Sequence, residues 1–318
     1  MTPTTVPVPL AGTRRSWGDR AFRSVTLASG LLVLLVLVLI AATMTGKAWP
    51  AFRHAGIGFV TKDNWDPNNN HFGALSLIYG TIVSSAIALV IAVPVSIGIA
   101  LFVTELAPAG VARVVTVIVD LLAAIPSVVF GLWAILSLAL TVQGPYKNLS
   151  NLTKSIPIVN SLFKGPVQGA SIMTAGIVLA IMIVPIISSL ARAALATVPE
   201  SDRAAALALG STRWEAIRVA VLPKVKGGLW GASMLGLGRA LGETIAVALI
   251  IGQSTHVSAD LLHPGATMAS TIALEWQEAG GEHASALIAL GVVLFVITII
   301  VNSIARGITR RSEARLAA

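Results

Sequence analysis

Long uncharged hydrophobic stretches, separated by polar segments, dominate the pattern of this chain. Six stretches are long enough to cross a hydrocarbon core of roughly 30 Å as helix, at 1.5 Å per residue. The six predicted spans lie at about residues 24–44, 80–104, 114–140, 170–192, 228–252 and 284–306. The pattern therefore predicts an all-α integral membrane protein with six transmembrane helices.

Composition narrows the class of protein further. Of the 318 residues, 55% are hydrophobic and only 11% are charged, whereas soluble domains carry about 25% charged residues. With a mean hydropathy of +0.85, the apolar surface exceeds what a water-facing fold of this length could bury, which excludes a soluble enzyme. The chain has no cysteine, so disulfides, thiolate metal sites and a cysteine nucleophile are excluded.

The basic residues predict the orientation, because Lys and Arg in short loops stay on the cytoplasmic side. With the N-terminus inside, 15 of the 22 Lys and Arg residues fall on the inner side and 6 on the outer side, and Arg239 lies within a span. Both termini are therefore expected in the cytoplasm of a cell-membrane protein. Anionic lipid headgroups explain the net charge of +8 better than nucleic acid does.

The spans divide the chain into a cytoplasmic N-terminal arm at 1–23, a permease domain at 24–306 and a cytoplasmic basic tail at 307–318. No small-residue cleavage site of the A-x-A kind follows the first span, so we expect it to be retained rather than removed as a signal. The long outer loops hold all five histidines, and no pair of them has the i, i+4 spacing of a helical metal site, so no metal ligands are predicted.

Three prolines lie well inside the second, third and fourth predicted spans. Pro94, Pro126 and Pro185 each remove a helix hydrogen bond and kink the chain. In a membrane, such breaks are tolerated where protein or a water-filled cavity satisfies the freed backbone groups. They favour a bundle that lines a pathway; packing kinks without a pathway are the alternative.

The inner loop at 193–227 is patterned as two short helices. An acidic first turn after Pro199 and a run of strong helix formers predict the first helix, which Gly210 ends. Ser211 is expected to cap a second helix that carries Trp214 and ends at Pro223. A Trp among charged residues on such a surface suits a groove of a partner protein. An amphipathic loop lying on the lipid headgroups is the alternative.

This loop resembles the cytoplasmic EAA loop of importer-type ABC permeases, EAA-x3-G-x9-I-x-LP. The residues in register are Ala204, Ala205, Ala206, Gly210, Ala220, Leu222 and Pro223. Ala204 replaces the usual Glu, and Ala220 replaces the usual Ile. The resemblance implies that the loop docks on an ATPase subunit and couples it to transport, with Trp214 near the contact.

Further blocks resemble the phosphate-specific branch of these permeases, the PstC family. They are 65–67, 72–75, 78–81, 122–131 and 238–247. Gln253 stands where that family suggests Asn, and the sister family PstA is the nearest alternative. The resemblance implies a six-helix bundle like that of type I ABC importer permeases. It also implies a second permease (PstA-like), two ATP-binding subunits (PstB-like) and an extracytoplasmic phosphate-binding protein (PstS-like).

The chain has no G-x-x-x-x-G-K-[ST] motif, so ATP hydrolysis is expected on a partner and no cofactor is predicted here. Three alternatives stay open. Within ABC importers, the cargo could be another oxyanion such as sulfate or molybdate. A secondary transporter would need its own coupling groups inside the spans, for which the chain offers Glu243 and Asp120. A membrane scaffold or receptor would not need charges at mid-depth.

The fifth predicted span carries the candidate substrate site. Arg239 lies ten residues past Leu229, roughly 15 Å deep and near the midplane, with Glu243 expected one turn away on the same face. A charge there costs at least ~2.5–3.5 kcal/mol, which makes the pair a functional hypothesis. A guanidinium suits phosphate oxygens, and the nearby glycines, among them Gly238, bring backbone close. The resemblance also points to Arg239 and Glu243 as transport residues; a structural salt bridge is the alternative.

Overall fold

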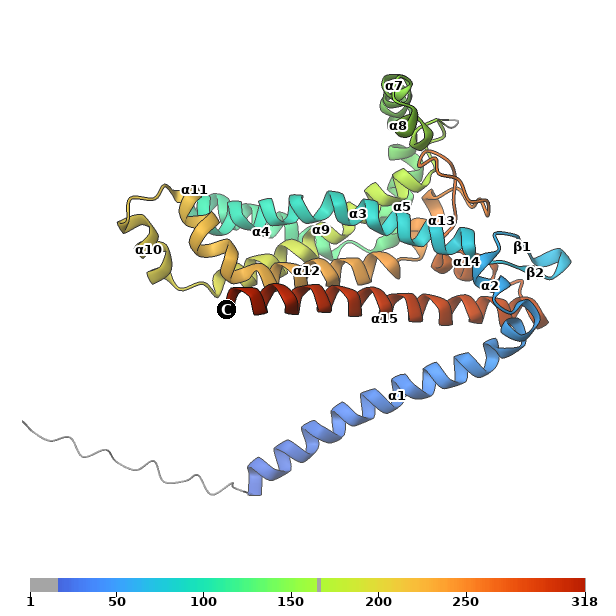
Figure 1. Cartoon of the computed structure of the whole chain (residues 1–318), viewed down its shortest axis with the longest axis horizontal. Helices are drawn as coiled ribbons and strands as arrows, with labels where there is room; N and C mark the ends of the chain where they lie inside the picture. The colour runs from blue at the N-terminus through green and yellow to red at the C-terminus, as the bar shows by residue number, and fades with distance from the viewer. Residues whose placement is uncertain (1–16, 165–166, 318) are drawn as a thin grey trace, which may run out of the picture.

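The structure, a computed structural model that describes residues 17–164 and 167–317, is an elongated helical bundle (Figure 1). The long helices are α1 (Trp17–Ala55), α3 (Leu75–Leu101), α4 (Ala109–Ala124), α9 (Ile172–Ala196), α12 (Leu222–Leu241) and α15 (Gly281–Ala317). The shorter helices are α2 (Gly58–Thr61), α5 (Ser127–Trp133), α6 (Ala139–Thr141), α7 (Gln143–Thr153), α8 (Pro157–Leu162), α10 (Glu200–Ala208), α11 (Arg213–Ala216), α13 (Ile245–Ile250) and α14 (Met268–Glu275). Single π-helical turns cover Phe102–Leu106, Ala134–Leu138 and Ile217–Val221.

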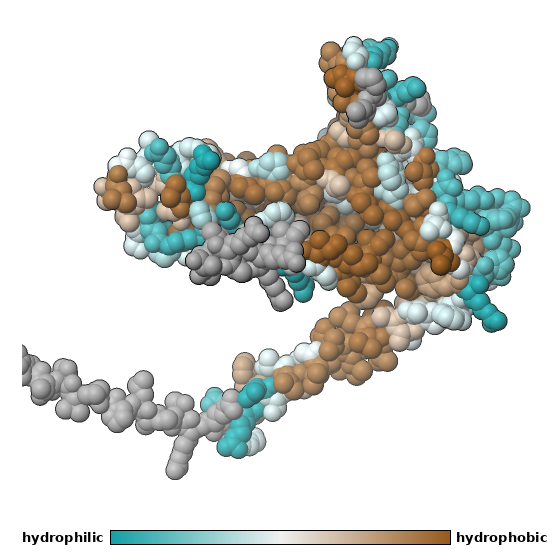
Figure 2. All heavy atoms as spheres, viewed as in Figure 1, coloured by the Kyte–Doolittle hydropathy of each residue, from teal (hydrophilic) through white to brown (hydrophobic). Residues whose placement is uncertain are grey.

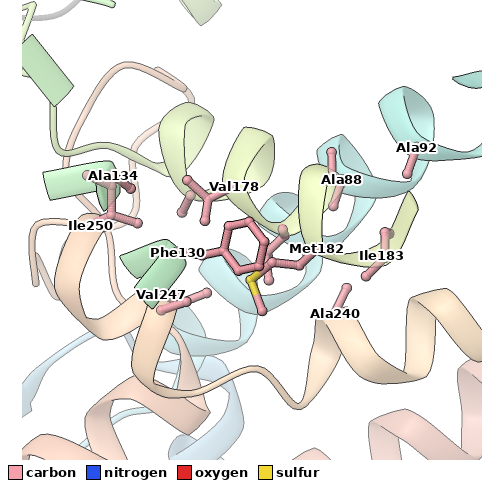
Figure 3. Close-up of a cluster of buried hydrophobic side chains, with 14 of the residues drawn as sticks. Ala88, Ala92, Phe130, Ala134, Val178, Met182, Ile183, Ala240, Val247 and Ile250 are labelled. Atoms are coloured by element: carbon pink, nitrogen blue, oxygen red, sulfur yellow. The ribbon is translucent and has the colours of Figure 1, made fainter. Parts of the chain in front are cut away.

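Helix α9 forms the centre of the bundle. Two thirds of its most apolar stretch is buried, 67%, and it packs against α3, α12 and the short helices α5 and α13. Phe130, Val178 and Ile250 meet in this core (Figure 3). Gly176 lets α3 approach, because a Cβ there would lie 2.5 Å from the side chain of Ile87. Small residues at helix contacts are typical of membrane bundles.

The hydropathy of the surface agrees with a membrane protein. Figure 2 shows hydrophobic side chains across the middle of the bundle and hydrophilic ones gathered at its two ends. Within the described residues, four helices are long and apolar enough to cross a membrane: α1, α3 with its π turn, α9 and α15. The bent pair α4 and α5–α6 makes a fifth. The predicted all-α membrane class is confirmed, and the count of six spans stays a prediction.

The third predicted span, 114–140, is broken rather than kinked. Its two halves meet at 91°, where Ile125 is extended with ψ 127° immediately before Pro126. The proline ring disfavours helical backbone in the residue that precedes it, so α4 ends one residue earlier. Pro94 and Pro185, by contrast, lie inside the continuous helices α3 and α9.

The fifth predicted span, 228–252, is also interrupted. Helix α12 ends at Leu241, and α13 begins at Ile245. The three residues between them, 242–244, are not helical. The prediction of one helix over this stretch was therefore wrong.

The loops expected on the outer side contain structure. Residues 141–169 hold α7 and α8, which project from the bundle (Figure 1). Residues 45–79 hold the end of α1 and a two-stranded hairpin, β1 (Trp65–Asp66) and β2 (His71–Phe72). The Trp65 indole donates to Glu275 Oε2 at 3.0 Å, and His283 Nε2 lies 2.8 Å from the same oxygen. Glu275 thus ties the hairpin to α14 and α15.

The two ends of the chain continue as helix into the segments predicted as arm and tail. Helix α1 begins at Trp17, and residues 1–16 of the predicted arm lie outside the described residues. Helix α15 runs on through residues 307–317 of the predicted tail. Helix α1 leans away from the bundle and meets it near Ala48 and Ala51 (Figure 1).

Candidate functional site

The predicted coupling loop forms the tip of one end of the bundle. Helix α10 ends at Ala208, two residues before the predicted stop at Gly210, whose φ of +86° lies in the left-handed region. Glycine enters that region without steric cost. The prediction that Ser211 caps the second helix was wrong, because Thr212 is the cap: its Oγ1 accepts from the Glu215 amide at 3.3 Å, and the Glu215 carboxylate accepts from the Thr212 amide at 2.7 Å. The spacing Thr-x-x-Glu was the sequence signal for this capping box.

Helix α11 does not end at Pro223. It runs through the π-helical turn 217–221 directly into α12, where Pro223 occupies the first turn. Within this run Pro223 removes one helical hydrogen bond, directly after the π-helical turn. Residues 213–241 therefore form one uninterrupted helical run from the tip to Leu241.

The tip exposes large apolar side chains. Trp214 is 60% exposed and Leu209 is 90% exposed, and Ala204 and Ala205 also face outward. Leu222, by contrast, is partly buried against the core formed by Leu195 and its neighbours. Exposed aromatic and apolar groups on a polar end are typical of a protein contact.

Arg203 anchors this tip to the body of the bundle, which the sequence analysis missed. Its Nη2 donates to Glu105 Oε1 at 2.8 Å, and its Nε donates to both oxygens of that carboxylate. The same guanidinium donates to the Leu195 and Val198 carbonyls at the end of α9. Glu105 raises the pKa of Arg203 above its ordinary value. The two residues are 98 positions apart, and no local pattern links them.

A second contact braces α10 against α12. Lys224 Nζ donates to Asp202 Oδ2 at 2.6 Å. Together with Arg203, this contact ties the tip to α9, to α12 and to the π-helical turn that follows α3.

A groove between α12 and α15 contains the candidate substrate residue. Its volume is about 640 Å³. The lining residues are Gly227, Gly231, Met234, Leu235, Gly238, Arg239, Asn302 and Arg306. Arg239 is exposed, so its guanidinium is accessible to an anion in the groove.

The prediction that Glu243 lies one turn from Arg239 on the same helical face was wrong. Helix α12 ends at Leu241, so Glu243 falls in the non-helical link to α13. Among the described residues the two side chains form no ion pair within 4 Å. The alternative of a structural salt bridge between them is therefore not supported by this geometry.

Asp120, the other acidic group considered for a coupling site, is already paired. Arg192 Nη2 lies 2.9 Å from Asp120 Oδ1, and Arg192 Nη1 donates to Thr116 Oγ1 at 2.8 Å. This pair joins α4 to α9. A paired carboxylate is a poor candidate for the proton-binding group that a secondary transporter needs.

Comparison with known proteins gives one family and a group of named relatives. Residues 92–314 match the model of the binding-protein-dependent transport system inner membrane component family. The chain is 42% identical over 302 residues to the phosphate transport system permease protein PstC of Mesorhizobium japonicum, covering 94% of this chain and 92% of that protein. It is 39% identical over 311 residues to PstC 2 of Mycobacterium tuberculosis, covering 96% and 95% of the two chains.

Solved structures support the same fold. One is a bacterial ABC transporter involved in the import of the acidic polysaccharide alginate, with a TM-score of 0.61 and 19% identity over 93% of this chain and 98% of that one. Another is the MetNI methionine ABC transporter in an inward-facing conformation, with a TM-score of 0.51 and 19% identity over 76% and 94% of the two chains. At this identity, the likeness concerns the fold alone.

Proposed function

Because this chain belongs to the family of binding-protein-dependent transport system inner membrane components, we propose that it is the PstC-type permease subunit of an ATP-driven phosphate importer. One observation carries the choice of phosphate. Relatives named as phosphate transport permeases align with more than nine tenths of both chains at about 40% identity. The chain is a multi-pass membrane protein, and its part in the importer is conduction, not catalysis.

The groove between α12 and α15 is the phosphate route through this subunit, and Arg239 provides a transient binding site for the anion in it. A guanidinium offers several N–H donors in a planar fork that matches phosphate oxygens. The groove is open along one side, so a second permease of the PstA type completes it. Such closure also satisfies polar groups at membrane depth.

Glu243 keeps the site at Arg239 weak. It is partly buried in the break between α12 and α13, where its own amide makes only a long hydrogen bond, 3.4 Å to the Ala240 carbonyl. A small shift of this link brings the carboxylate toward Arg239, where it competes with the anion. Competition of this kind favours release, which transport requires as much as binding.

The tip formed by α10 and α11 docks on the ATPase. Its apolar surface, with Trp214 at the centre, fits a groove of a PstB-type subunit. Arg203 carries movement of the tip to α3 and α9, and the run 213–241 carries it to Arg239. Closure of the ATPase pair on ATP then biases the permease between two rigid-body states.

In the orientation we propose, the tip, both termini and the excess of basic residues lie in the cytoplasm. The opposite end, with the hairpin and α7–α8, then faces a PstS-type phosphate-binding protein. Membrane lipid surrounds the apolar belt, and nucleic acid is not a partner.

The test is ATP-dependent uptake of radiolabelled phosphate by vesicles that contain the complete complex, with unlabelled sulfate or molybdate as competitor. We expect phosphate accumulation that a tenfold excess of either competitor barely lowers. Efficient competition by sulfate or molybdate would reassign the cargo. Uptake that persists without ATP would contradict the importer class.

A further inference from the structure

Two polar residues of α15, Asn302 and Arg306, line the same groove as Arg239. They are four positions apart, so they lie one above the other on a single helical face. Arg306 is exposed, and it forms no ion pair with the residues that the structure describes. The groove is thus lined by two arginines and an amide, with no carboxylate among its lining residues.

The two arginines come from different helices of the groove, Arg239 from α12 and Arg306 from α15. Gly227 and Arg239, both in its lining, are twelve residues apart on α12, which is about 18 Å of helix. Helix α15 packs against α12 and runs in the opposite direction (Figure 1), so Arg306 lies nearer to the beginning of α12 than Asn302 does. A groove of this length covers more than half of a hydrocarbon core of roughly 30 Å.

On α12 the groove is bounded by two glycines that pack against none of the described residues. A Cβ added at Gly231 or Gly238 would meet no atom within 4 Å. At Gly228, one position from the groove lining, a Cβ would lie 2.7 Å from that of Ala194. Packing within the chain explains the glycine at 228, whereas 231 and 238 keep the groove wide.

We infer that Arg306, with Asn302 beside it, forms a second oxyanion site on the α15 side of this groove. This inference rests on the proposed function, because the anion it receives is the phosphate that leaves Arg239. The guanidinium supplies donors only, and the NH2 group of the Asn302 amide adds further donors for a phosphate with several acceptor oxygens. A solvent-exposed arginine binds an anion weakly. Weak binding suits the last site that phosphate occupies before it leaves the groove.

Phosphate uptake by the complete complex in vesicles tests the site. Arg306→Gln should lower uptake per inserted complex about tenfold, and Arg306→Lys should restore at least half of the wild-type rate because it keeps the charge. Arg113→Gln is the matched control: Arg113 is an exposed arginine at the start of α4, outside the groove, and its loss should leave uptake unchanged. Gly238→Leu, which narrows the groove next to Arg239, should also block uptake.

Wild-type uptake by the Arg306→Gln complex would overturn the inference. A loss that occurs in vesicles with anionic lipid but disappears in pure phosphatidylcholine would assign Arg306 to lipid headgroups and also overturn it; equal losses in both would support phosphate. If Arg306→Gln does not insert, Asn302→Asp tests the same site, since a carboxylate of similar size repels the anion, and normal uptake by that variant would refute it. Failure of the wild-type complex to move phosphate would instead refute the proposed function.

Discussion

Replacing Gly210 by valine tests whether the tip transmits the action of the ATPase. Gly210 has a φ of +86° in the link 209–212 between α10 and α11, the one positive φ in that link. Valine cannot adopt such a backbone without strain, because its branched Cβ clashes with the flanking peptide groups. The substitution should therefore favour tip conformations that do not fit the ATPase.

The size of the effect follows from the surroundings of Gly210. A Cβ there would meet no atom within 4 Å, so crowding adds nothing and the backbone strain is the whole cost. A left-handed conformation costs an ordinary L-residue roughly 1–2 kcal/mol. That cost lowers the population of the docked conformation by a factor of about 5–30, and transport should fall by the same factor.

The assay compares phosphate uptake with ATP binding in the complete complex. Gly210→Val should lower uptake while ATP binding stays normal, because the nucleotide site belongs to another subunit. Gly210→Asn should keep most of the uptake, since asparagine tolerates the left-handed region. Gly110→Val is a matched control, because Gly110 also has open space around its Cβ but no positive φ. Equal uptake by the Val and Asn variants of Gly210 would refute the reasoning.

Four further predictions concern the groove, the anchor and the assembly. Arg239→Gln should abolish uptake at a normal membrane level, because the amide lacks the charge that attracts the anion; normal uptake would contradict this. Glu243→Gln should lower turnover more than assembly, measured as uptake per purified complex, and an equal loss of both would indicate a structural role. In a double-mutant cycle on thermal unfolding, Arg203→Gln and Glu105→Gln should show a coupling of about 1–3 kcal/mol, whereas additive effects would show that the anchor contributes nothing. The purified chain alone should give no ATP-independent phosphate uptake in vesicles, because the groove lacks its facing subunit.

The class of fold and the outline of the tip could be predicted from local sequence. Uninterrupted apolar runs predict membrane helices wherever the backbone stays helical, as in α9 and α15. A run of helix formers followed by Gly210 predicted both the end of α10 and its left-handed cap. These features depend on residues a few positions apart, which a sequence displays directly.

The rest depends on contacts and breaks that hydropathy does not record. Apolar residues flank Gly242, Glu243 and Thr244 on both sides, so the hydropathy of the whole stretch gave no sign that Glu243 would leave the helical face of Arg239. The ion pair of Arg203 with Glu105 joins residues 98 positions apart. The sequence around either residue does not predict this contact. The capping box at Thr212 could be predicted from the Thr-x-x-Glu spacing, but the hydroxyl of the adjacent Ser211 was an alternative cap.

The most direct test of the account is ATP-driven phosphate accumulation by vesicles that contain the partner permease, the ATPase and the binding protein, with and without this chain. Phosphate should accumulate only when this chain is present and ATP is supplied on the side of the membrane where the tip lies. Equal accumulation without the chain, or none with the complete set of subunits, would contradict its role as a phosphate permease.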